Sequence, residues 1–308
     1  MKKIKNIAII GAGTAGLATA ILLARQDIDV TLFEKVERLQ PVGAGLLLQP
    51  AGLAVFEHLG ILPDTLKLGA IVTGLEGRLA NQRLLVNSHY HEIDPQHYGI
   101  GVHRATLCHL LSSKLQDYAA SVTWKMAHDI HRLQEHQQGV TIFGQHLGLP
   151  FESNFDAVII ANGARSQLRP SSWVKVDKAY PWGAVWSIVP ECQTLDPQIL
   201  HQFYDRSQIM MGILPTGAIP QAPTQRLSSV FWSLPAQQLQ QFLDNPQKHD
   251  FLLRQISSRW KPIADWLEQV MQKQDSLQWL SAQYRDVVMT KFGKGRIGII
   301  GDAAHAMS

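Results

Sequence analysis

The chain has 308 residues, which at about 150 residues per domain predicts two domains or one large one. Hydrophobic residues make up 45% and charged residues 17%, an ordinary globular composition that excludes disorder for the bulk of the chain. Lys and Arg total 28 against 25 Asp and Glu, and no run of five or six like charges occurs, which argues against a dedicated nucleic-acid or membrane-surface role.

The two cysteines, Cys108 and Cys192, lie far apart and form neither a Cys-x-x-Cys pair nor a zinc-binding spacing. This usage predicts a reduced, cytoplasmic setting. The first ten residues are basic and then apolar, as in a signal peptide, but Gly11 and Gly13 interrupt the run and no small-residue cleavage site follows. No stretch approaches the roughly 20 apolar residues that span a bilayer, so we expect no stable membrane insertion.

A βαβ unit opens the chain. Residues 4–10 are apolar and β-branched, as in a strand that is buried on both faces of a parallel sheet. A glycine turn follows, then a strong helix-forming stretch over residues 14–26 and a second strand over residues 29–35. This order predicts an α/β fold with a doubly wound, Rossmann-like parallel sheet.

The middle of the chain predicts a helix and a further central strand. Residues 104–119 have helical periodicity, with Leu107, Leu110, Leu111 and Leu115 on one face. Two short alternating runs follow at residues 121–127 and 139–143. The wholly apolar run at residues 156–161 indicates another buried strand of the parallel sheet.

A β-rich region begins near residue 179. Residues 179–234 are rich in Trp, Pro and Gly and contain short strand-like runs, a texture typical of an antiparallel sheet. Residues 235–245 and 249–260 have the periodicity of amphipathic helices. Residues 296–308 then return to the buried-strand pattern, followed by Gly301-Asp302 and small residues that we expect to begin a helix.

These patterns predict a Rossmann-like nucleotide-binding domain with an inserted antiparallel β-sheet domain. The predicted nucleotide-binding parts are residues 1–75, 101–170 and 285–308. The predicted inserted parts are a β-rich excursion at residues 76–100 and a sheet with helices at residues 171–284.

The sequence Gly-Ala-Gly-Thr-Ala-Gly at residues 11–16 lies directly between the first strand and the first helix. Gly11 permits a tight turn, Gly13 lets the backbone approach a pyrophosphate, and Gly16 lets the helix pack close to the sheet. Glu34 ends the second strand about 20 residues later, where a carboxylate accepts hydrogen bonds from a ribose. The alternative is a purely structural glycine turn with a solvent-facing Glu. The dinucleotide-site residues predicted here are Gly11, Ala12, Gly13, Ala15, Gly16, Glu34 and Lys35.

The turn at Gly301-Asp302 favours a flavin over a nicotinamide dinucleotide, because an Asp there can bind a ribityl hydroxyl. At this point the sequence resembles the class A flavoprotein monooxygenases, the aromatic hydroxylases related to p-hydroxybenzoate hydroxylase and salicylate hydroxylase. Three motifs carry the resemblance in the family's order: GAGTAGL (11–17), DAVIIANGARSQLR (156–169) and GDAAHAMS (301–308). Two further segments support it: FEKVERLQPVGAG (33–45) and GVHRATL (101–107).

The resemblance implies FAD as the cofactor and adds site residues. In the family an Arg like Arg104 reaches the FAD. The backbone from Val42 to Gly45, including Gly43, passes the isoalloxazine. An Asp like Asp302, preceded by Gly301, binds the ribityl chain.

The sequence departs from the family pattern at two places. The middle motif usually reads Asp-Gly, whereas here it is Asn162-Gly163, followed by Arg165, Ser166 and Arg169. Asn keeps the hydrogen-bonding shape of Asp and loses its charge. Family members also continue past the third motif with a Pro- and Gly-rich turn and a long helix. Because this chain ends at Ser308, we expect a chain that is truncated at its C-terminus.

By resemblance, the expected enzyme is an FAD-dependent monooxygenase. It would use NAD(P)H and O₂ to hydroxylate a small, aromatic substrate through a flavin hydroperoxide, as a monomer or homodimer without a nucleic-acid partner. Two alternatives remain open at this point: an FAD-dependent oxidoreductase without oxygen insertion, and a non-catalytic flavin-fold remnant that binds a ligand.

The substrate pocket is predicted only from the strand-like runs of the inserted domain. The candidates are Trp186, Tyr204, Met211 and Trp232, and alternation alone does not tell which of them face the flavin. No catalytic residue is assigned, and the expected cofactor set contains no metal. His89 and His91 would share one strand face near acidic residues, but they lack a metal-ligand spacing and fit a polar sheet surface better.

Overall fold

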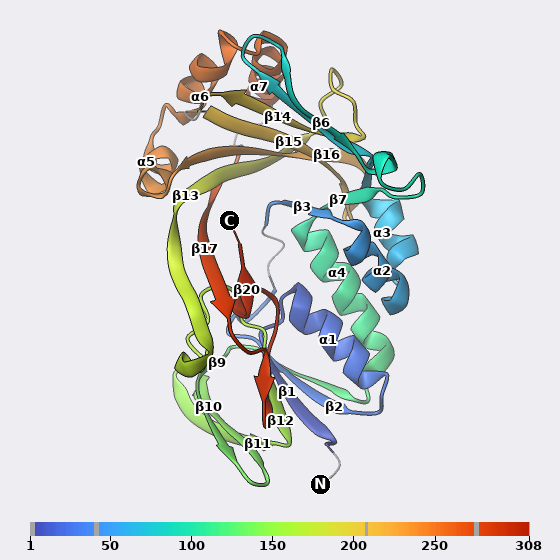
Figure 1. The fold of residues 1–308 in the computed structure, drawn as a ribbon, viewed down its shortest axis with the longest axis vertical. Helices are drawn as coiled ribbons and strands as arrows, with labels where there is room; N and C mark the ends of the chain where they lie inside the picture. Colours follow the sequence, from blue (N-terminus) through green and yellow to red (C-terminus); the bar gives the residue numbers. More distant parts are fainter. Residues whose placement is uncertain (1–3, 40–42, 207–208, 274–276, 308) are drawn as a thin grey trace. The chain divides into compact units, whose positions relative to one another are not determined.

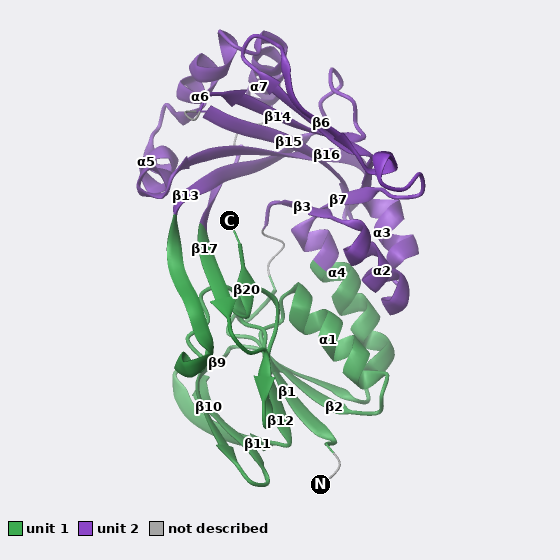
Figure 2. Ribbon diagram, in the orientation of Figure 1, with its two compact units in different colours: residues 1–40, 108–180, 284–308 green, residues 41–107, 181–283 purple. Residues whose placement is uncertain are grey.

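The computed structural model describes residues 4–39, 43–206, 209–273 and 277–307, so Val42 and Ser308, both named above, lie outside the described residues. The chain divides into two compact units (Figure 2). Unit 1 comprises residues 1–40, 108–180 and 284–308, and unit 2 comprises residues 41–107 and 181–283. The mixed α/β class with a Rossmann-like parallel sheet is confirmed, whereas the domain limits given above stay a prediction.

Unit 1 contains a six-stranded sheet in the order β18-β19-β12-β1-β2-β8. All neighbouring strands in it are parallel except β18 and β19. Its strands are β1 (Asn6–Ile10), β2 (Asp29–Phe33), β8 (Val122–Lys125), β12 (Ala157–Ile160), β18 (Gly293–Lys294) and β19 (Ile297–Ile299). The helix α1 (Thr14–Ala24) connects β1 to β2, as the sequence predicted.

A second, three-stranded sheet covers the other face of the parallel sheet. It consists of β9 (His128–His136), β10 (Gly139–His146) and β11 (Leu149–Phe155), paired antiparallel. Successive side chains of β1 point to opposite faces of the parallel sheet, so each face is covered by a different layer. Ala8 and Ile10 share a core cluster with Val140 and Ile142 of β10, while Ile9 projects toward α1. Figure 1 shows α1 and the β9–β11 sheet on opposite sides of β1.

The helix predicted over residues 104–119 is α4 (Arg104–Leu115), followed by the short 3₁₀ helix η2 (Gln116–Tyr118). All four leucines of its predicted apolar face are buried. The remaining short helix of unit 1 before β13 (Val174–Pro190) is η3 (Ser171–Trp173). The strands β13 and β17 (Leu280–Met289) each run from one unit into the other.

Unit 2 is built on a large sheet in which β13, β16, β15, β14, β5 and β6 are neighbours in that order. The pairing is antiparallel except between β14 and β5, which are parallel. The strands are β5 (Gly74–Leu79), β6 (Leu84–His89), β14 (Ile199–Asp205), β15 (Ile209–Ile219) and β16 (Ala222–Pro235). The β5–β14 pair can be parallel because the two strands are far apart in the sequence and no hairpin joins them.

The two faces of this sheet have different neighbours. Helices cover one face, where Met211, Trp232 and Trp260 belong to one hydrophobic core. These helices are η4 (Ala236–Gln238), α5 (Leu239–Asp244), α6 (Lys248–Ser257) and α7 (Lys261–Lys273) (Figure 1). We call the opposite face, which carries Trp186, Phe231 and Leu214, the open face.

A small sheet of β3 (Gly45–Leu48), β7 (Gly99–His103) and β4 (Ala70–Val72) lies against part of the open face. A Cβ at Gly101 would lie 1.8 Å from the Pro215 carbonyl oxygen, so this close approach depends on glycine. The rest of this region forms α2 (Pro50–Leu59), α3 (Leu62–Leu68) and the 3₁₀ helix η1 (Tyr90–Glu92). Within the described residues, no helix is long and apolar enough to cross a membrane.

Two local expectations were wrong. The residues after Gly301-Asp302 do not begin a helix; they form the 3₁₀ turn η5 (Gly301–Ala303) and the short strand β20 (His305–Ala306). β20 pairs with Val287 and Val288 of β17, and this tertiary pairing overrides the helix preference of the small residues. His89 and His91 also do not share a strand, because β6 ends at His89 and His91 lies in η1.

Candidate functional site

The turn between β1 and α1 is shaped by its glycines. Gly11 has φ +107°, and a Cβ there would lie 2.5 Å from the Ala161 carbonyl oxygen. A Cβ at Gly16 would lie 2.0 Å from the Gly11 carbonyl oxygen, so α1 can start this close to β1 only with glycine at that position. At Gly13, by contrast, the Cβ position has no described neighbour within 4 Å. The turn is therefore tightly packed on the protein side and open at Gly13.

Helix α1 begins at this open place. Gly13 is its N-cap residue, without a side-chain cap, and the first turn contains no acidic side chain. The first N–H groups of a helix lack partners within the helix and, with the helix dipole, favour a bound anion. A pyrophosphate can therefore approach the backbone at Gly13.

Glu34 lies at the end of β2 and is tied to the same turn. One carboxylate oxygen accepts a hydrogen bond from the Ala12 backbone N–H at 3.0 Å, and the other accepts one from the Val36 N–H at 3.2 Å. A carboxylate has about four acceptor positions, so two such bonds leave capacity for ribose hydroxyls. The neighbouring Lys35 side chain is exposed.

The turn η5 lies next to the start of α1. A Cβ at Gly301, whose φ is +58°, would lie 2.8 Å from the Ala15 Cβ. Asp302, the following residue, is exposed. Unit 1 therefore brings together three sequence-predicted groups: the glycine turn, Glu34 and the Gly301-Asp302 turn.

Arg169 of the middle motif has a role that the sequence does not reveal. Its side chain is only 3% exposed, and its guanidinium donates to the carbonyl oxygens of Ala164 (2.6 Å), Ser166 (2.6 Å) and Ala303 (2.7 Å). It also donates to the Asp177 carboxylate at 3.0 Å. Burial lowers the pKa of Arg169, and the nearby Asp177 opposes this shift. Arg169 thus joins the loop after β12 to η5.

Unit 2 holds the other two predicted cofactor residues, Gly43 and Arg104. A Cβ at Gly43 would lie 2.6 Å from the Arg104 Cβ, and the Arg104 N–H donates to the Ala44 carbonyl oxygen at 3.2 Å. The arginine stem therefore lies over the Gly43 backbone. The preceding His103 is buried and its Nδ1 accepts the Ala105 N–H at 3.2 Å. Burial lowers the pKa of His103, which favours the neutral ring that this bond requires.

The four predicted substrate residues lie on two different faces of the large sheet. Met211 and Trp232 are paired across β15 and β16 and lie in the core under the helices, with 0% and 3% exposure. Trp186 pairs with Phe231 on the open face. Tyr204 also projects on that face, where it contacts the Gly77 position and donates a hydrogen bond to Gln202.

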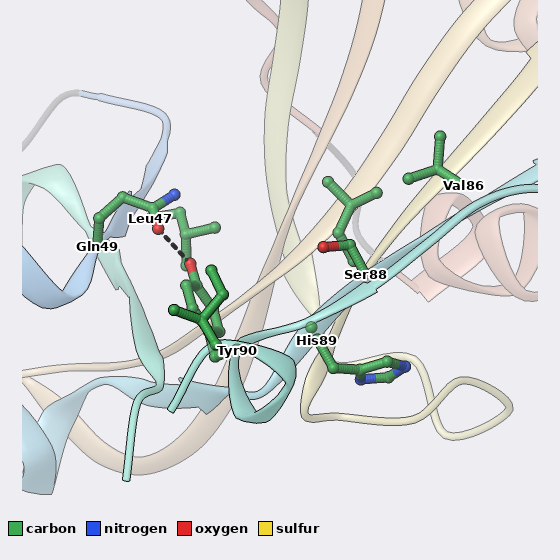
Figure 3. Close-up of a pocket in the computed structure, with 9 residues that line it drawn as sticks. Leu47, Gln49, Val86, Ser88, His89 and Tyr90 are labelled. Atoms are coloured by element: carbon green, nitrogen blue, oxygen red, sulfur yellow. Dashed lines mark hydrogen bonds between the residues drawn. The ribbon is translucent and has the colours of Figure 1, made fainter. Parts of the chain in front are cut away.

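A cavity of about 240 Å³ opens within unit 2 (Figure 3). Apolar side chains form much of its wall, and polar groups enter it from β6, η1 and the N-cap of α2. The lining residues are Leu47, Gln49, Gly74, Leu75, Val86, Ser88, His89, Tyr90 and Ile93. In the described part of the chain, no group of three or more His, Cys, Asp or Glu is arranged to hold a metal ion.

The residues of unit 1 fit the adenosine and pyrophosphate parts of a dinucleotide. The open Cβ position at Gly13 leaves room for a phosphate at the start of α1, and the Glu34 carboxylate keeps acceptor capacity for a ribose. Asp302, on the turn beside Ala15, provides a further exposed carboxylate. These assignments stay a prediction about individual residues.

Comparison with known proteins identifies the family. The family model described as FAD binding domain matches residues 5–308. The 3-amino-4-hydroxybenzoate 2-monooxygenase of Streptomyces cremeus is 25% identical, over 97% of this chain and 72% of that protein. An FAD-dependent urate hydroxylase of Klebsiella pneumoniae is 27% identical, over 97% of this chain and 74% of that protein.

Solved structures agree on the fold. The 2-methyl-3-hydroxypyridine-5-carboxylic acid oxygenase matches with a TM-score of 0.77 at 21% identity, covering 99% of this chain and 76% of that chain. The p-nitrophenol 4-monooxygenase of Pseudomonas putida matches with a TM-score of 0.78 at 17% identity, covering 100% and 75%. The chain therefore belongs to the FAD binding domain family and is a class A FAD-dependent monooxygenase.

Proposed function

We propose that this enzyme hydroxylates a small aromatic substrate with O₂ and NAD(P)H, with its FAD held by the residues assembled in unit 1. The observation that carries the proposal is the β1–α1 turn, which is closed by Gly11 and Gly16 and open at Gly13. Bound there, FAD supplies the redox chemistry between the nicotinamide donor, O₂ and the substrate.

The protein's own residues hold and orient the cofactor in this proposal. The N–H groups of the first turn of α1 face the pyrophosphate, and Glu34 accepts hydrogen bonds from the adenosine ribose. Asp302 accepts them from the ribityl chain. Gly43 and Arg104, which contact each other, are the residues of unit 2 that we propose for FAD binding.

The open face of the large sheet is the proposed wall of the substrate pocket. Trp186, Tyr204 and Phe231 give it aromatic surface, and Trp186 is only 8% exposed. Met211 and Trp232 do not belong to this proposed wall, because both are packed in the helix-covered core. An aromatic wall suits the ring substrates named for the relatives, 3-amino-4-hydroxybenzoate and urate.

Replacing Asp302 with alanine is expected to raise the dissociation constant of FAD roughly ten- to hundredfold, because a hydrogen bond to a charged group contributes roughly 1.5–3 kcal/mol. Flavin fluorescence titration measures this constant. Asp129→Ala, at another exposed carboxylate of unit 1, is the matched control and should leave FAD affinity unchanged. Equal affinity of the Asp302 variant and the parent protein would remove Asp302 from the site.

The reaction is tested with labelled oxygen. The protein is incubated with FAD and desalted, and retention of the flavin is read from its visible spectrum. It is then supplied with NADH or NADPH, ¹⁸O₂ and a panel of phenols, hydroxybenzoates and purines. A product with one labelled oxygen atom is the expected result. A product oxidised without label would instead indicate an oxidoreductase that inserts no oxygen, and failure to retain FAD would contradict the proposed cofactor site.

A further inference from the structure

No residue that lines the cavity of Figure 3 is among those assigned above to the FAD or the substrate. It is bounded by β3 on one side and by the β5–β6 hairpin on the other. Leu75 pairs with Ser88, and Gly77 with Val86, so Leu75, Val86 and Ser88 all project on the open face of the sheet. Leu47 of β3 packs with Leu75 in a small core cluster.

One pair of polar side chains dominates the cavity. The Tyr90 phenol donates a hydrogen bond to Gln49 Oε1 at 2.5 Å. The bond uses the phenol proton, so the two Gln49 amide N–H groups and a lone pair of the Tyr90 oxygen can serve a ligand. Figure 3 shows the Gln49 and Tyr90 groups pointing toward each other, with the Ser88 hydroxyl on the facing strand.

Gly99 makes room for this pair. A Cβ at Gly99 would lie 2.9 Å from the Tyr90 hydroxyl and 2.9 Å from Leu47 Cδ1. Any side chain there would displace the phenol or the apolar wall beside it. The position of the Tyr90 hydroxyl therefore depends on a glycine from a third strand, β7.

The lining carries no Lys, Arg, Asp or Glu. His89 is the one basic residue in it, and Figure 3 shows its ring directed away from the Gln49–Tyr90 pair. The His89 Nε2 bonds Asn87 Oδ1 at 3.0 Å, and its ring lies 5.2 Å from that of His91. Burial raises the pKa of Tyr90, so the phenol stays neutral near pH 7. The cavity thus offers only neutral hydrogen-bonding groups.

The volume and the apolar walls of the cavity suit a ligand with a single ring. An apolar cavity of about 150 Å³ can hold benzene, so about 240 Å³ accommodates a ring with a polar substituent. Val86 and Ile93, both cavity-lining, are 36% and 83% exposed, so a ligand would cover apolar surface that water now contacts. We propose that this cavity binds a small neutral phenol through Gln49 and Tyr90. The assignment does not depend on the proposed function.

The test uses phenol as the probe, titrated into the purified protein with FAD present and NAD(P)H absent, and followed by calorimetry and saturation-transfer NMR. Saturable binding is expected. Gln49→Leu should weaken it roughly three- to tenfold, the loss expected for one hydrogen bond. Gln49 is exposed, and although it is the N-cap residue of α2 its side chain makes no capping hydrogen bond, so this variant should fold. Ser88→Trp, on the exposed edge strand β6, should fill the cavity and abolish binding.

Tyr118→Phe is the matched control, because the Tyr118 hydroxyl also bonds a side chain, accepting from Arg25 Nε at 3.0 Å, and lies in unit 1 outside the cavity. It should leave phenol affinity unchanged. Benzoate is the charged counterpart and should bind at least about tenfold more weakly, since the described residues that line the cavity include no Lys or Arg. The assignment is overturned if phenol does not bind saturably, if Gln49→Leu weakens binding no more than Tyr118→Phe does, or if benzoate binds as tightly as phenol. Because no turnover is measured, failure of the proposed reaction leaves these outcomes unaffected.

Discussion

Replacing Arg169 with methionine is expected to lower the free energy of unfolding by about 3–5 kcal/mol, the range for breaking a buried ion pair from one side. Methionine keeps most of the apolar stem, so the loss falls on the guanidinium. That group donates to Ala164, Ser166 and Ala303 carbonyl oxygens and to Asp177. Denaturant unfolding followed by circular dichroism measures the change.

The same substitution is expected to weaken FAD binding. The Ala303 carbonyl belongs to η5, the turn that carries Gly301 and Asp302, and Arg169 Nε donates to it at 2.7 Å. Without this bond η5 is held to the loop after β12 by fewer contacts. Flavin fluorescence titration of the variant, at a temperature where it remains folded, separates this effect from unfolding.

Arg285→Met is the matched control. Arg285 also donates to Asp177, but its side chain is 33% exposed. An ion pair of that exposure contributes at most about 1 kcal/mol. If the two variants lose equal stability, the Asp177 pairing explains both, and the carbonyl contacts of Arg169 contribute nothing measurable.

The sequence predicted well those parts of the fold that depend on local patterns. The strand of residues 4–10, the glycine turn and the following helix correspond to β1 and α1, because uninterrupted apolar β-branched runs and helix-forming stretches carry strong local signals. The four leucines of α4 are buried for the same reason. Of the β9–β11 sheet, only β10 was predicted, as the run at residues 139–143, because β9 and β11 are mostly exposed and carry weak apolar alternation; the other short run, residues 121–127, contains β8 of the parallel sheet.

Alternation could not tell which face of the large sheet is covered. Met211 and Trp186 lie on opposite faces of the sheet. The Met211 face is covered because helices α5 to α7, which come later in the chain, pack on it. Long-range contacts also decide the other surprises. Arg169 was placed in a cofactor motif, yet its partners include Ala303, 134 residues away. The Gln49–Tyr90 pair forms across 41 residues and depends on the absence of a side chain at Gly99.

Gly13→Ala is expected to raise the dissociation constant of FAD at least about tenfold while changing stability little. The Cβ position at Gly13 has no described neighbour within 4 Å, and the backbone there, with φ −75°, is one that alanine adopts readily. Alanine at a helix N-cap costs at most about 1 kcal/mol relative to glycine. The methyl group would, however, occupy the space through which a pyrophosphate approaches the start of α1.

Gly16→Ala should have the opposite effect: its main consequence should be a loss of protein stability. Its Cβ would lie 2.0 Å from the Gly11 carbonyl oxygen, so α1 or the turn must move, at a cost of roughly 1–3 kcal/mol or more. Thermal unfolding without FAD and flavin titration of both variants give the comparison. A Gly13 variant that binds FAD as tightly as the parent would mean that the phosphates lie elsewhere. A large stability loss in that variant would mean that the space at Gly13 serves packing, because only a ligand contact can lower FAD affinity and leave the apoprotein's stability unchanged.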